Sequence, residues 1–351
     1  MTKEDTKELW KLCFDDTEEF VDLYFDRKYK DEINMTVYDD ARLISALQMI
    51  PYPMTYCDRV ISTSYISGAC THPDFRSKGT MKQLLFETFG KMYESNVLLS
   101  TLIPAEEWLF GYYEKSGYSP AFDYAMEEID ANTLVISPDY KIEEYTPYQL
   151  DVHSYLNRKM MERPCCIQHP MDDFKVILAD LKLSNGKLFV ARLNGELVGL
   201  VMCVPYETTL YIKELFSENE AIKESLLKTA AQQTGTLKIE CILPPNGDKK
   251  DKKLGMARII NAQKMLELYA AKYKGLDFSI GLTDKLIAAN NGYYLLQNGK
   301  CEKVGSPNAK DHIDLDIRQL TQALLGYRLE LLPDYFRCFA DQYPYMSLML
   351  N

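Results

Sequence analysis

The sequence has 351 residues, a length that predicts two or three domains. Hydrophobic residues make up 46% and the formal net charge is -11, so the chain can bury a large core but lacks the positive charge that nucleic acids and anionic membranes attract. The same acidity is compatible with a cationic partner such as an amine. Charges interrupt every apolar run before it could span a bilayer, and the N-terminus is charged from its third residue, so we expect a cytoplasmic protein.

A metal site is not expected. The nine cysteines form no C-x-x-C pair, and the four histidines lack the spacing typical of metal ligands. We expect most of the cysteines to be small buried side chains.

The first 130 residues alternate between helical and strand patterns. Apolar spacing predicts helices at 5–14, 16–28, 77–94 and 105–116, and strands at 33–38, 41–52, 60–71, 96–104 and 118–129. Gly68 predicts a bulge within the third strand. Antiparallel strands followed by strand–helix–strand units are typical of an α+β fold with a mixed sheet.

A second unit follows a linker at 131–141. Its clearest feature is a hairpin turned at Asn194-Gly195, a pair that favours a type I′ turn. A strand at 210–216, a helix at 219–233 and a strand at 236–245 come next. Because NVLLSTLIPA in the first unit and TLKIECILPP here are both apolar strands that follow a long helix, we interpret the second unit as a diverged copy of the first.

A third unit begins after the basic run DKKDKK. Apolar spacing predicts a helix from Met256 to Lys272, followed by a strand at 278–283. The Asn-Gly pairs at 291–292 and 298–299 predict hairpin turns, and a further helix is expected at 317–325.

The stretch THPDFRSKGTMKQLL, residues 71–85, places two cations and a glycine ahead of a predicted helix. A helix N-terminus exposes unpaired amides with partial positive charge, and a glycine allows a phosphate to approach them closely. Arg76, Lys78 and Gly79 therefore fit a phosphate-binding loop. The alternative is a helix start with incidental surface charge.

In this context the stretch resembles the acetyl-CoA loop of the Gcn5-related N-acetyltransferase (GNAT) superfamily, which reads Arg/Gln-x-x-Gly-x-Gly/Ala. Arg76, Gly79 and Met81 occupy its defining positions, and Met81 departs from the small last residue. With a bulky residue at this position, the chain resembles the enhanced-intracellular-survival branch of the superfamily. Proteins of that branch have two acetyltransferase-like units and a sterol-carrier-like C-terminal domain. MARIINAQKMLELYAAKYKG and TDKLIAANNGYYLL resemble that third domain.

The resemblance implies an α+β architecture of three domains. Residues 1–130 would form the catalytic acetyltransferase domain, 140–250 a degenerate second copy, and 254–351 the sterol-carrier-like domain. The second copy has Phe216-Ser-Glu-Asn-Glu-Ala221 where the first has its loop. Because two carboxylates there would repel a pyrophosphate, we expect acetyl-CoA to bind only once per chain. The resemblance also implies assembly into a homo-oligomer.

The resemblance further assigns positions to the coenzyme. Backbone groups of Ala69, Cys70 and Thr71 should pair with the pantetheine arm as an added strand would. The pyrophosphate should be held by amides of Ser77, Lys78, Gly79, Thr80, Met81 and Lys82. Arg76 and Lys78 should neutralise its charge.

Acetyl transfer to an amine needs an acid and a base. Tyr113 precedes a Gly-Tyr pair in FGYYEKSGY, as the acid does in the family that this chain resembles, and the alternative is a packed structural tyrosine. The strand ISTSYISGACT carries no carboxylate, and the resemblance gives the base role to the chain's own α-carboxylate on Asn351. The apolar end SLMLN favours a buried terminus, against the alternative of an end packed on the surface.

These features predict an acetyl-CoA-dependent N-acetyltransferase that acts on an amine of a small molecule or peptide. Two other functions stay open: a non-catalytic acyl-CoA-binding or sensor protein, and a lipid carrier that uses the third domain. The sequence does not distinguish aminoglycosides, polyamines, lysine side chains and small peptides as acceptors.

Overall fold

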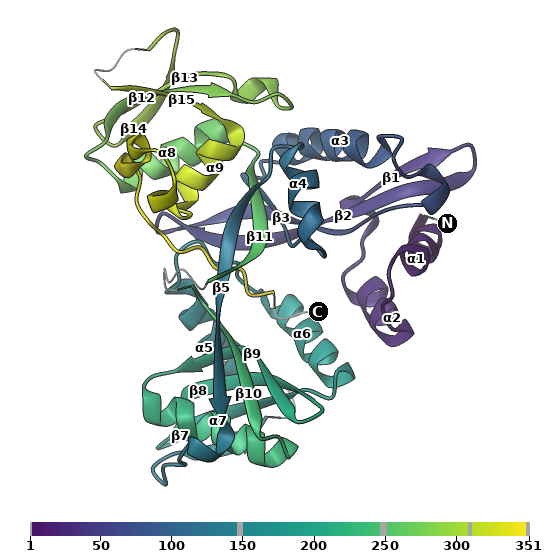
Figure 1. The fold of residues 1–351 in the computed structure, drawn as a ribbon, viewed down its shortest axis with the longest axis vertical. Helices are drawn as coiled ribbons and strands as arrows, with labels where there is room; N and C mark the ends of the chain where they lie inside the picture. Colours follow the sequence, from purple (N-terminus) through teal and green to yellow (C-terminus); the bar gives the residue numbers. More distant parts are fainter. Residues whose placement is uncertain (1, 146–149, 246–250, 308–310, 349–351) are drawn as a thin grey trace. The chain divides into compact units, whose positions relative to one another are not determined.

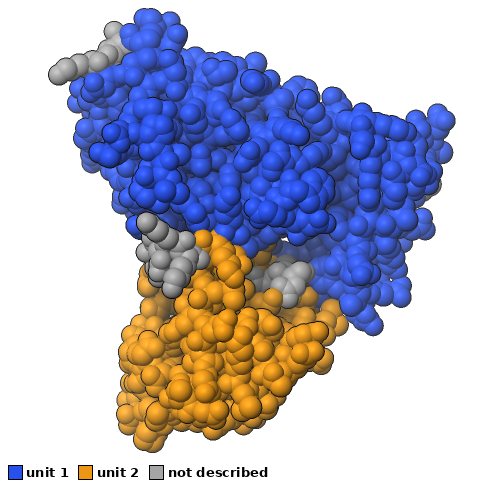
Figure 2. All heavy atoms as spheres, viewed as in Figure 1, with its two compact units in different colours: residues 1–123, 253–344 blue, residues 124–252, 345–351 orange. Residues whose placement is uncertain are grey.

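The computed structural model describes residues 2–145, 150–245, 251–307 and 311–348. The chain forms two compact units (Figure 2): unit 1 comprises residues 1–123 and 253–344, and unit 2 comprises residues 124–252 and 345–351. Both combine helices with a mixed sheet, so the predicted α+β class is confirmed (Figure 1).

Two helices open unit 1, as the sequence predicts. They are α1 (Thr2–Cys13) and α2 (Glu18–Arg27). The Thr17 side chain caps α2 by accepting a hydrogen bond from the amide of Phe20. Trp10 of α1 is buried against the rings of Tyr24 and Phe25, which holds the two helices together.

The main sheet of unit 1 places its strands in the order β1-β2-β3-β4-β11-β5. The strands are β1 (Asn34–Asp39), β2 (Arg42–Tyr56), β3 (Arg59–Thr71), β4 (Leu99–Leu102), β5 (Ser119–Asp130) and β11 (Lys252–Ile259). Two helices accompany them, α3 (Thr80–Glu94) and α4 (Glu107–Glu114). The buried face of α3, with Leu85, Phe89 and Met92, packs into the core that Tyr113 and Met256 share.

The predicted bulge at Gly68 is present. Cys70 pairs with Ala46 and Ser67 with Gln48, so Gly68 and the following residue face one residue of β2. Gly68 has a φ of 57°, and a Cβ there would lie 2.1 Å from the ring of Trp10. Both the backbone conformation and the packing of α1 therefore require glycine.

The predicted helix from Met256 to Lys272 is wrong in its first part. Residues 252–259 form β11, which pairs antiparallel with β4, and helix α8 (Ala262–Lys272) begins only after Asn261. Met256, Ala257, Arg258 and Ile259 are all fully buried. A strand covered on both faces shows no polar–apolar alternation, so its apolar run cannot be told from a buried helix by periodicity.

The remainder of unit 1 has a four-stranded sheet in the order β14-β13-β12-β15. Its elements are β12 (Asp277–Thr283), β13 (Gly292–Gln297), β14 (Lys300–Val304), β15 (His312–Asp316) and α9 (Ile317–Leu325). The turn at Asn298-Gly299 and the helix at 317–325 are confirmed. The turn expected at 291–292 is wrong, because Gly292 begins β13 and the Asn291 side chain accepts from the amide of Asp284 to close a longer loop.

The strands of unit 2 lie in the order β5-β10-β9-β8-β7-β6, and the residues of β5 from 124 onward belong to this unit. Its elements are β6 (Lys141–Glu144), α5 (Leu150–Met161), α6 (Met171–Leu183), β7 (Lys187–Leu193), β8 (Glu196–Tyr206), β9 (Thr209–Ser217), α7 (Glu220–Thr234) and β10 (Lys238–Leu243). Asn194 and Gly195 both have positive φ, as a type I′ turn requires. β9 and β10 are parallel and joined by α7, as β3 and β4 are by α3. Helices α5 and α6 were not predicted from the sequence.

The structure also contains short 3-10 helices, at Asp31–Ile33, Pro73–Phe75, Ala131–Thr133, Ala288–Asn290, Leu329–Leu331 and Asp334–Cys338. Among the helices described, none combines the length and the apolar character needed to cross a bilayer.

Candidate active site

The outer half of β3 has an edge that β4 does not cover. In the described register β4 runs parallel to β3 from Thr63 to Tyr65. Beyond that point β3 continues to Thr71, where Cys70 and Thr71 pair with β2 on the opposite side. The predicted pantetheine positions, Ala69 to Thr71, lie on this outer half. Its backbone can accept an added extended segment, because a strand pairs through both of its edges.

The loop between β3 and α3 ends in a glycine-capped helix start. Gly79 has a φ of 85°, and, apart from its two chain neighbours, no described residue has an atom within 4 Å of the position that its Cβ would take. The first turn of α3 contains no acidic residue, and Gly79 offers no side-chain cap. The amides of Thr80, Met81 and Lys82 thus lie at a helix N-terminus with uncompensated positive potential.

The loop's cations are tied to their surroundings. Arg76 Nε donates to the carbonyl of Thr71 at 3.1 Å, which fastens the loop to the end of β3. Lys78 Nζ lies 4.7 Å from the centre of the Phe75 ring. Both side chains are exposed, so they add positive charge beside the α3 N-terminus.

A pair of thiols borders the same strand and was not singled out from the sequence. Cys13 of α1 packs against the cluster that contains Cys70, and its Sγ lies 3.5 Å from the Thr71 carbonyl. The Cys70 thiol and the Arg76 guanidinium lower the pKa of Cys13 to about 6, although burial opposes them. The pKa of Cys70 is raised by the same contact with Cys13 and by burial.

Tyr113 lies on α4 with 8% of its surface exposed. Burial raises the pKa of its hydroxyl, and nearby Tyr112, Tyr65 and Cys70 add to the rise. Two of these neighbours belong to β3, so the predicted acid lies beside the strand predicted to hold pantetheine. A neutral phenol there is a proton donor throughout the physiological pH range.

The Gly-Tyr pair after Tyr113 fixes the end of α4. A Cβ on Gly117 would lie 1.8 Å from Arg258 Nη1, so the guanidinium requires glycine here. The Tyr118 hydroxyl is buried and hydrogen-bonded to Ser100 Oγ at 2.6 Å. These two contacts, to β11 and β4, orient the helix that carries Tyr113.

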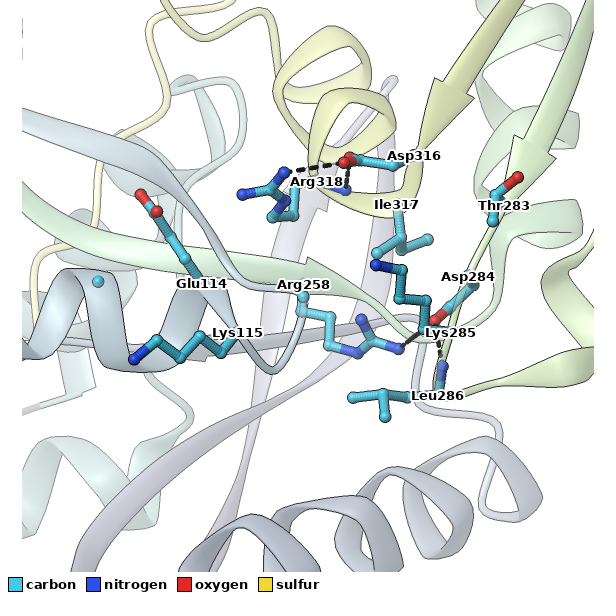
Figure 3. A pocket seen from close by; sticks show the side chains of 12 residues that line it. Glu114, Lys115, Arg258, Thr283, Asp284, Lys285, Leu286, Asp316, Ile317 and Arg318 are labelled. Atoms are coloured by element: carbon cyan, nitrogen blue, oxygen red, sulfur yellow. Dashed lines mark hydrogen bonds and ion pairs between the residues drawn. The ribbon is translucent and has the colours of Figure 1, made fainter.

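A cavity of about 370 Å³ lies beside the contact between Gly117 and Arg258, within unit 1 (Figure 3). Its wall includes Glu114, Lys115 and Lys285, and Arg258 and Asp284 form a buried ion pair within it. Neither Tyr113 nor the loop at 76–82 lines this cavity, so it is separate from the candidate coenzyme site.

The corresponding helix of unit 2 differs at its N-terminus. The Asn219 side chain caps α7 by accepting from the amide of Ile222 at 3.0 Å. Glu218 precedes this cap and Glu220 follows it, and both carboxylates are engaged by lysines or arginines of unit 2. The helix start is therefore occupied by the chain's own oxygen and flanked by negative charge.

The predicted base, Asn351, lies outside the described residues. The preceding residues 345–348 belong to unit 2. Among the residues described, no group of three or more His, Cys, Asp or Glu could hold a metal ion.

Two protein-family models match the chain. Residues 2–121 match the acetyltransferase (GNAT) domain, and residues 262–330 match the sterol carrier protein domain. None of the curated protein sequences compared with it matches.

Solved structures share the fold over nearly the whole chain. A GCN5-related N-acetyltransferase from Anabaena variabilis matches with a TM-score of 0.81 and 17% identity, over 98% of this chain and 96% of that one. Eis1 from Mycobacterium abscessus matches with a TM-score of 0.77 and 14% identity, over 99% and 97%. At these identities the likeness establishes the fold.

Proposed function

Because residues 2–121 match the model of the acetyltransferase (GNAT) domain, we propose that the protein transfers the acetyl group of acetyl-CoA to an amine. The observation that carries the proposal is the junction of β3 and α3. A bulged strand with an uncovered outer half leads into a glycine-capped helix whose first turn has no acid.

The strand and the helix at this junction would bind different parts of the coenzyme. Ala69, Cys70 and Thr71 would pair through their backbones with the amide-containing pantetheine arm. The amides from Ser77 to Lys82 would hold the pyrophosphate, with the charges of Arg76 and Lys78 nearby. The open space at Gly79 supports close approach of a ligand to the backbone.

Unit 2 would bind no coenzyme. A pyrophosphate at α7 would have to displace the Asn219 cap and approach Glu218 and Glu220. Like charges at a helix start remove the attraction that the helix dipole supplies. We therefore propose one acetyl-CoA site per chain.

The chemistry would use one acid and one base. The amine nitrogen attacks the thioester carbonyl, the carbon–sulfur bond breaks, and Tyr113 donates its proton to the departing thiolate. As the amide forms, the nitrogen releases the proton that it carries after the attack, and this proton restores the Tyr113 hydroxyl. An amine that arrives as an ammonium ion must first lose a proton, which we assign to the α-carboxylate of Asn351. The raised pKa of Tyr113 supports its role, since the hydroxyl keeps its proton until the thiolate leaves.

The acceptor would be a cationic amine, in keeping with the net charge of -11. Incubating the purified protein with acetyl-CoA and a panel of aminoglycosides, polyamines and lysine peptides tests the proposal. Release of free CoA thiol and a mass gain of one acetyl group on an amine are expected. Tight binding of acetyl-CoA without turnover on any amine would instead favour an acyl-CoA sensor.

A further inference from the structure

The cavity beside Gly117 and Arg258 has no part in the proposed acetyl transfer. Its wall is formed by α4, by β11, by the end of β12 with the loop that follows it, and by the start of α9 (Figure 3). All of these residues belong to unit 1. The volume of about 370 Å³ is in the range of small-molecule sites. The side chains of the wall indicate which kind of ligand the cavity fits.

Arg258 brings a buried cation with unused donors to this wall. Its side chain is fully buried, and in the described part of the chain Nε and Nη1 have no hydrogen-bond acceptor. The Cβ position of Gly117 lies 1.8 Å from Nη1 and 3.2 Å from Ile317 Cγ2. Gly117 and Ile317 both line the cavity, so Nη1 lies at its wall. A buried donor without an acceptor is unfavourable, and an oxygen ligand in the cavity would remove this cost.

Asp284 cannot supply the missing acceptor. Its two oxygens already accept hydrogen bonds from Arg258 Nη2, from the amides of Leu286 and Ile287, and from the Asn290 side chain. A carboxylate has about four lone-pair sites, so these bonds fill it. A guanidinium carries N–H donors on all three of its nitrogens, and only Nη2 binds Asp284. The donors of Nε and Nη1 are therefore open to a second acceptor.

The charge around the cavity favours an anion as this acceptor. The wall carries four cations and three carboxylates, an excess of one positive charge in a chain whose net charge is -11. Two of the cations are paired with two of the carboxylates, as in the exposed pair of Arg318 with Asp316. Lys115 and Lys285 are exposed and form no ion pair with a described residue, and the remaining carboxylate is Glu114.

We propose that this cavity binds the carboxylate or phosphate group of a small molecule, with Arg258 as the main donor and Lys285 as an added positive charge. Arg258 is fixed in advance, because Asp284 holds Nη2 and the guanidinium carbon lies 4.7 Å from the centre of the Phe89 ring. A donor that is already in place loses little entropy when a ligand binds. Guanidinium groups bind both kinds of anion through paired hydrogen bonds. The site is distinct from the coenzyme loop and does not depend on the proposed function.

Hydrogen–deuterium exchange of the full-length protein tests the proposal, with inorganic phosphate and malonate as probes and chloride at equal ionic strength as the reference. The informative peptide is 283–291, because two of its amides donate to Asp284, the partner of Arg258. With an anion at about 10 mM, a site with a Kd of about 1 mM should slow the exchange of this peptide about 10-fold. The peptide 76–82 reports separately on phosphate at the start of α3.

Two variants keep Arg258 and change the cavity around it. Gly111→Leu adds a side chain from α4, at an exposed position where, apart from its neighbours and its own helix, no described residue has an atom within 4 Å of the Cβ. Gly90→Leu on α3 is the control, because it has the same open surroundings and does not line the cavity. Lys285→Gln removes a charge from the wall, and its control Lys300→Gln removes one elsewhere in unit 1. Gly111→Leu should lose most of the protection, Lys285→Gln should lose part of it, and the two controls should keep it.

Each result decides the proposal. Protection by phosphate alone would assign the site to a phosphate group, and protection by malonate alone would assign it to a carboxylate. Unchanged exchange of 283–291 with both anions would overturn the proposal and mean that water satisfies Arg258. Protection that persists undiminished in both Gly111→Leu and Lys285→Gln would place the anion elsewhere and overturn it as well. Protection confined to 76–82 would overturn the cavity site while supporting the coenzyme loop.

Discussion

Arg258 Nη2 lies 2.8 and 2.9 Å from the two carboxylate oxygens of Asp284, and neither side chain is exposed to solvent. Asp284 also accepts from the amides of Leu286 and Ile287 and from Asn290. Arg258 Nε and Nη1 have no hydrogen-bond partner among the residues described, and its guanidinium carbon lies 4.7 Å from the centre of the Phe89 ring. Asp284 therefore balances the positive charge of the arginine, and packing against Phe89 and Gly117 fixes its position.

Arg258→Met should destabilise unit 1 by about 3–5 kcal/mol, because it leaves a buried carboxylate without its countercharge. Both tryptophans, Trp10 and Trp108, belong to unit 1, so urea unfolding followed by tryptophan fluorescence reports on this unit. Arg318→Met is the matched control. Its side chain forms an exposed pair with Asp316, for which a loss of about 0–1 kcal/mol is expected. Equal losses in the two variants would contradict the prediction.

Gly79→Val should weaken acetyl-CoA binding about 10-fold or more, since the new branched side chain would project into the space that the pyrophosphate needs. Calorimetry on the parent should give one site per chain. Gly195→Val is the control for backbone strain, because Gly195 also has a positive φ and, apart from its chain neighbours, no described residue has an atom within 4 Å of its Cβ position. Both variants should lose stability, and only Gly79→Val should lose affinity. Two sites per chain, or unchanged affinity in Gly79→Val, would count against the assignment.

Local patterns predicted much of the fold. The helix at 317–325 has a strongly one-sided apolar face and the Asn194-Gly195 pair has the backbone preference of its turn, so neither depends on distant residues. β11 could not be found in this way. It lies beside β4 more than 150 residues earlier in the chain, and burial on both faces removes its alternation. α5 and α6 were not predicted, although their apolar spacing, such as Val152, Tyr155 and Leu156 in α5, is that of an amphipathic helix.

The residues of the candidate site fall into the same two groups: those that a local pattern reveals, and those whose role depends on residues far away in the sequence. The loop at 76–82 and Tyr113 lie within short motifs, so sequence and resemblance located them. Arg258 acts on residues that are remote in the sequence, because its guanidinium packs on Phe89 and takes the space that a Gly117 side chain would need. Nothing in the neighbourhood of a lone arginine reveals such partners.

Tyr113→Phe should lower kcat by about 10²- to 10⁴-fold with little change in acetyl-CoA affinity, the usual effect of removing a general acid. The hydroxyl is needed only when the thiolate leaves, so the loss belongs to the transition state. Tyr112→Phe, one position earlier on α4, should stay close to the parent. Steady-state kinetics and calorimetry on the three proteins measure both quantities. A Tyr113→Phe variant within a few-fold of the parent would make this residue structural.

Deprotonation of Tyr113 should not lower kcat below about pH 10, the ordinary pKa of a tyrosine. Burial disfavours the phenolate and so raises the pKa, which extends the protonated, proton-donating form to higher pH. Measuring kcat across the neutral and alkaline range checks this. An alkaline limb centred near pH 8 would mean that another group supplies the proton.

A C-terminal extension should abolish turnover while leaving the fold and acetyl-CoA binding intact. An added tag keeps every side chain but converts the α-carboxylate of Asn351 into an amide, which cannot take a proton from an ammonium ion. Deleting Met349 to Asn351 should have the same effect, although it also removes apolar side chains, so the extension is the cleaner test. The same tag at the N-terminus is the control and should leave kcat unchanged. Mass spectrometry must show that the tag is intact, and full activity in that protein would move the base to a side chain or a chain of water molecules.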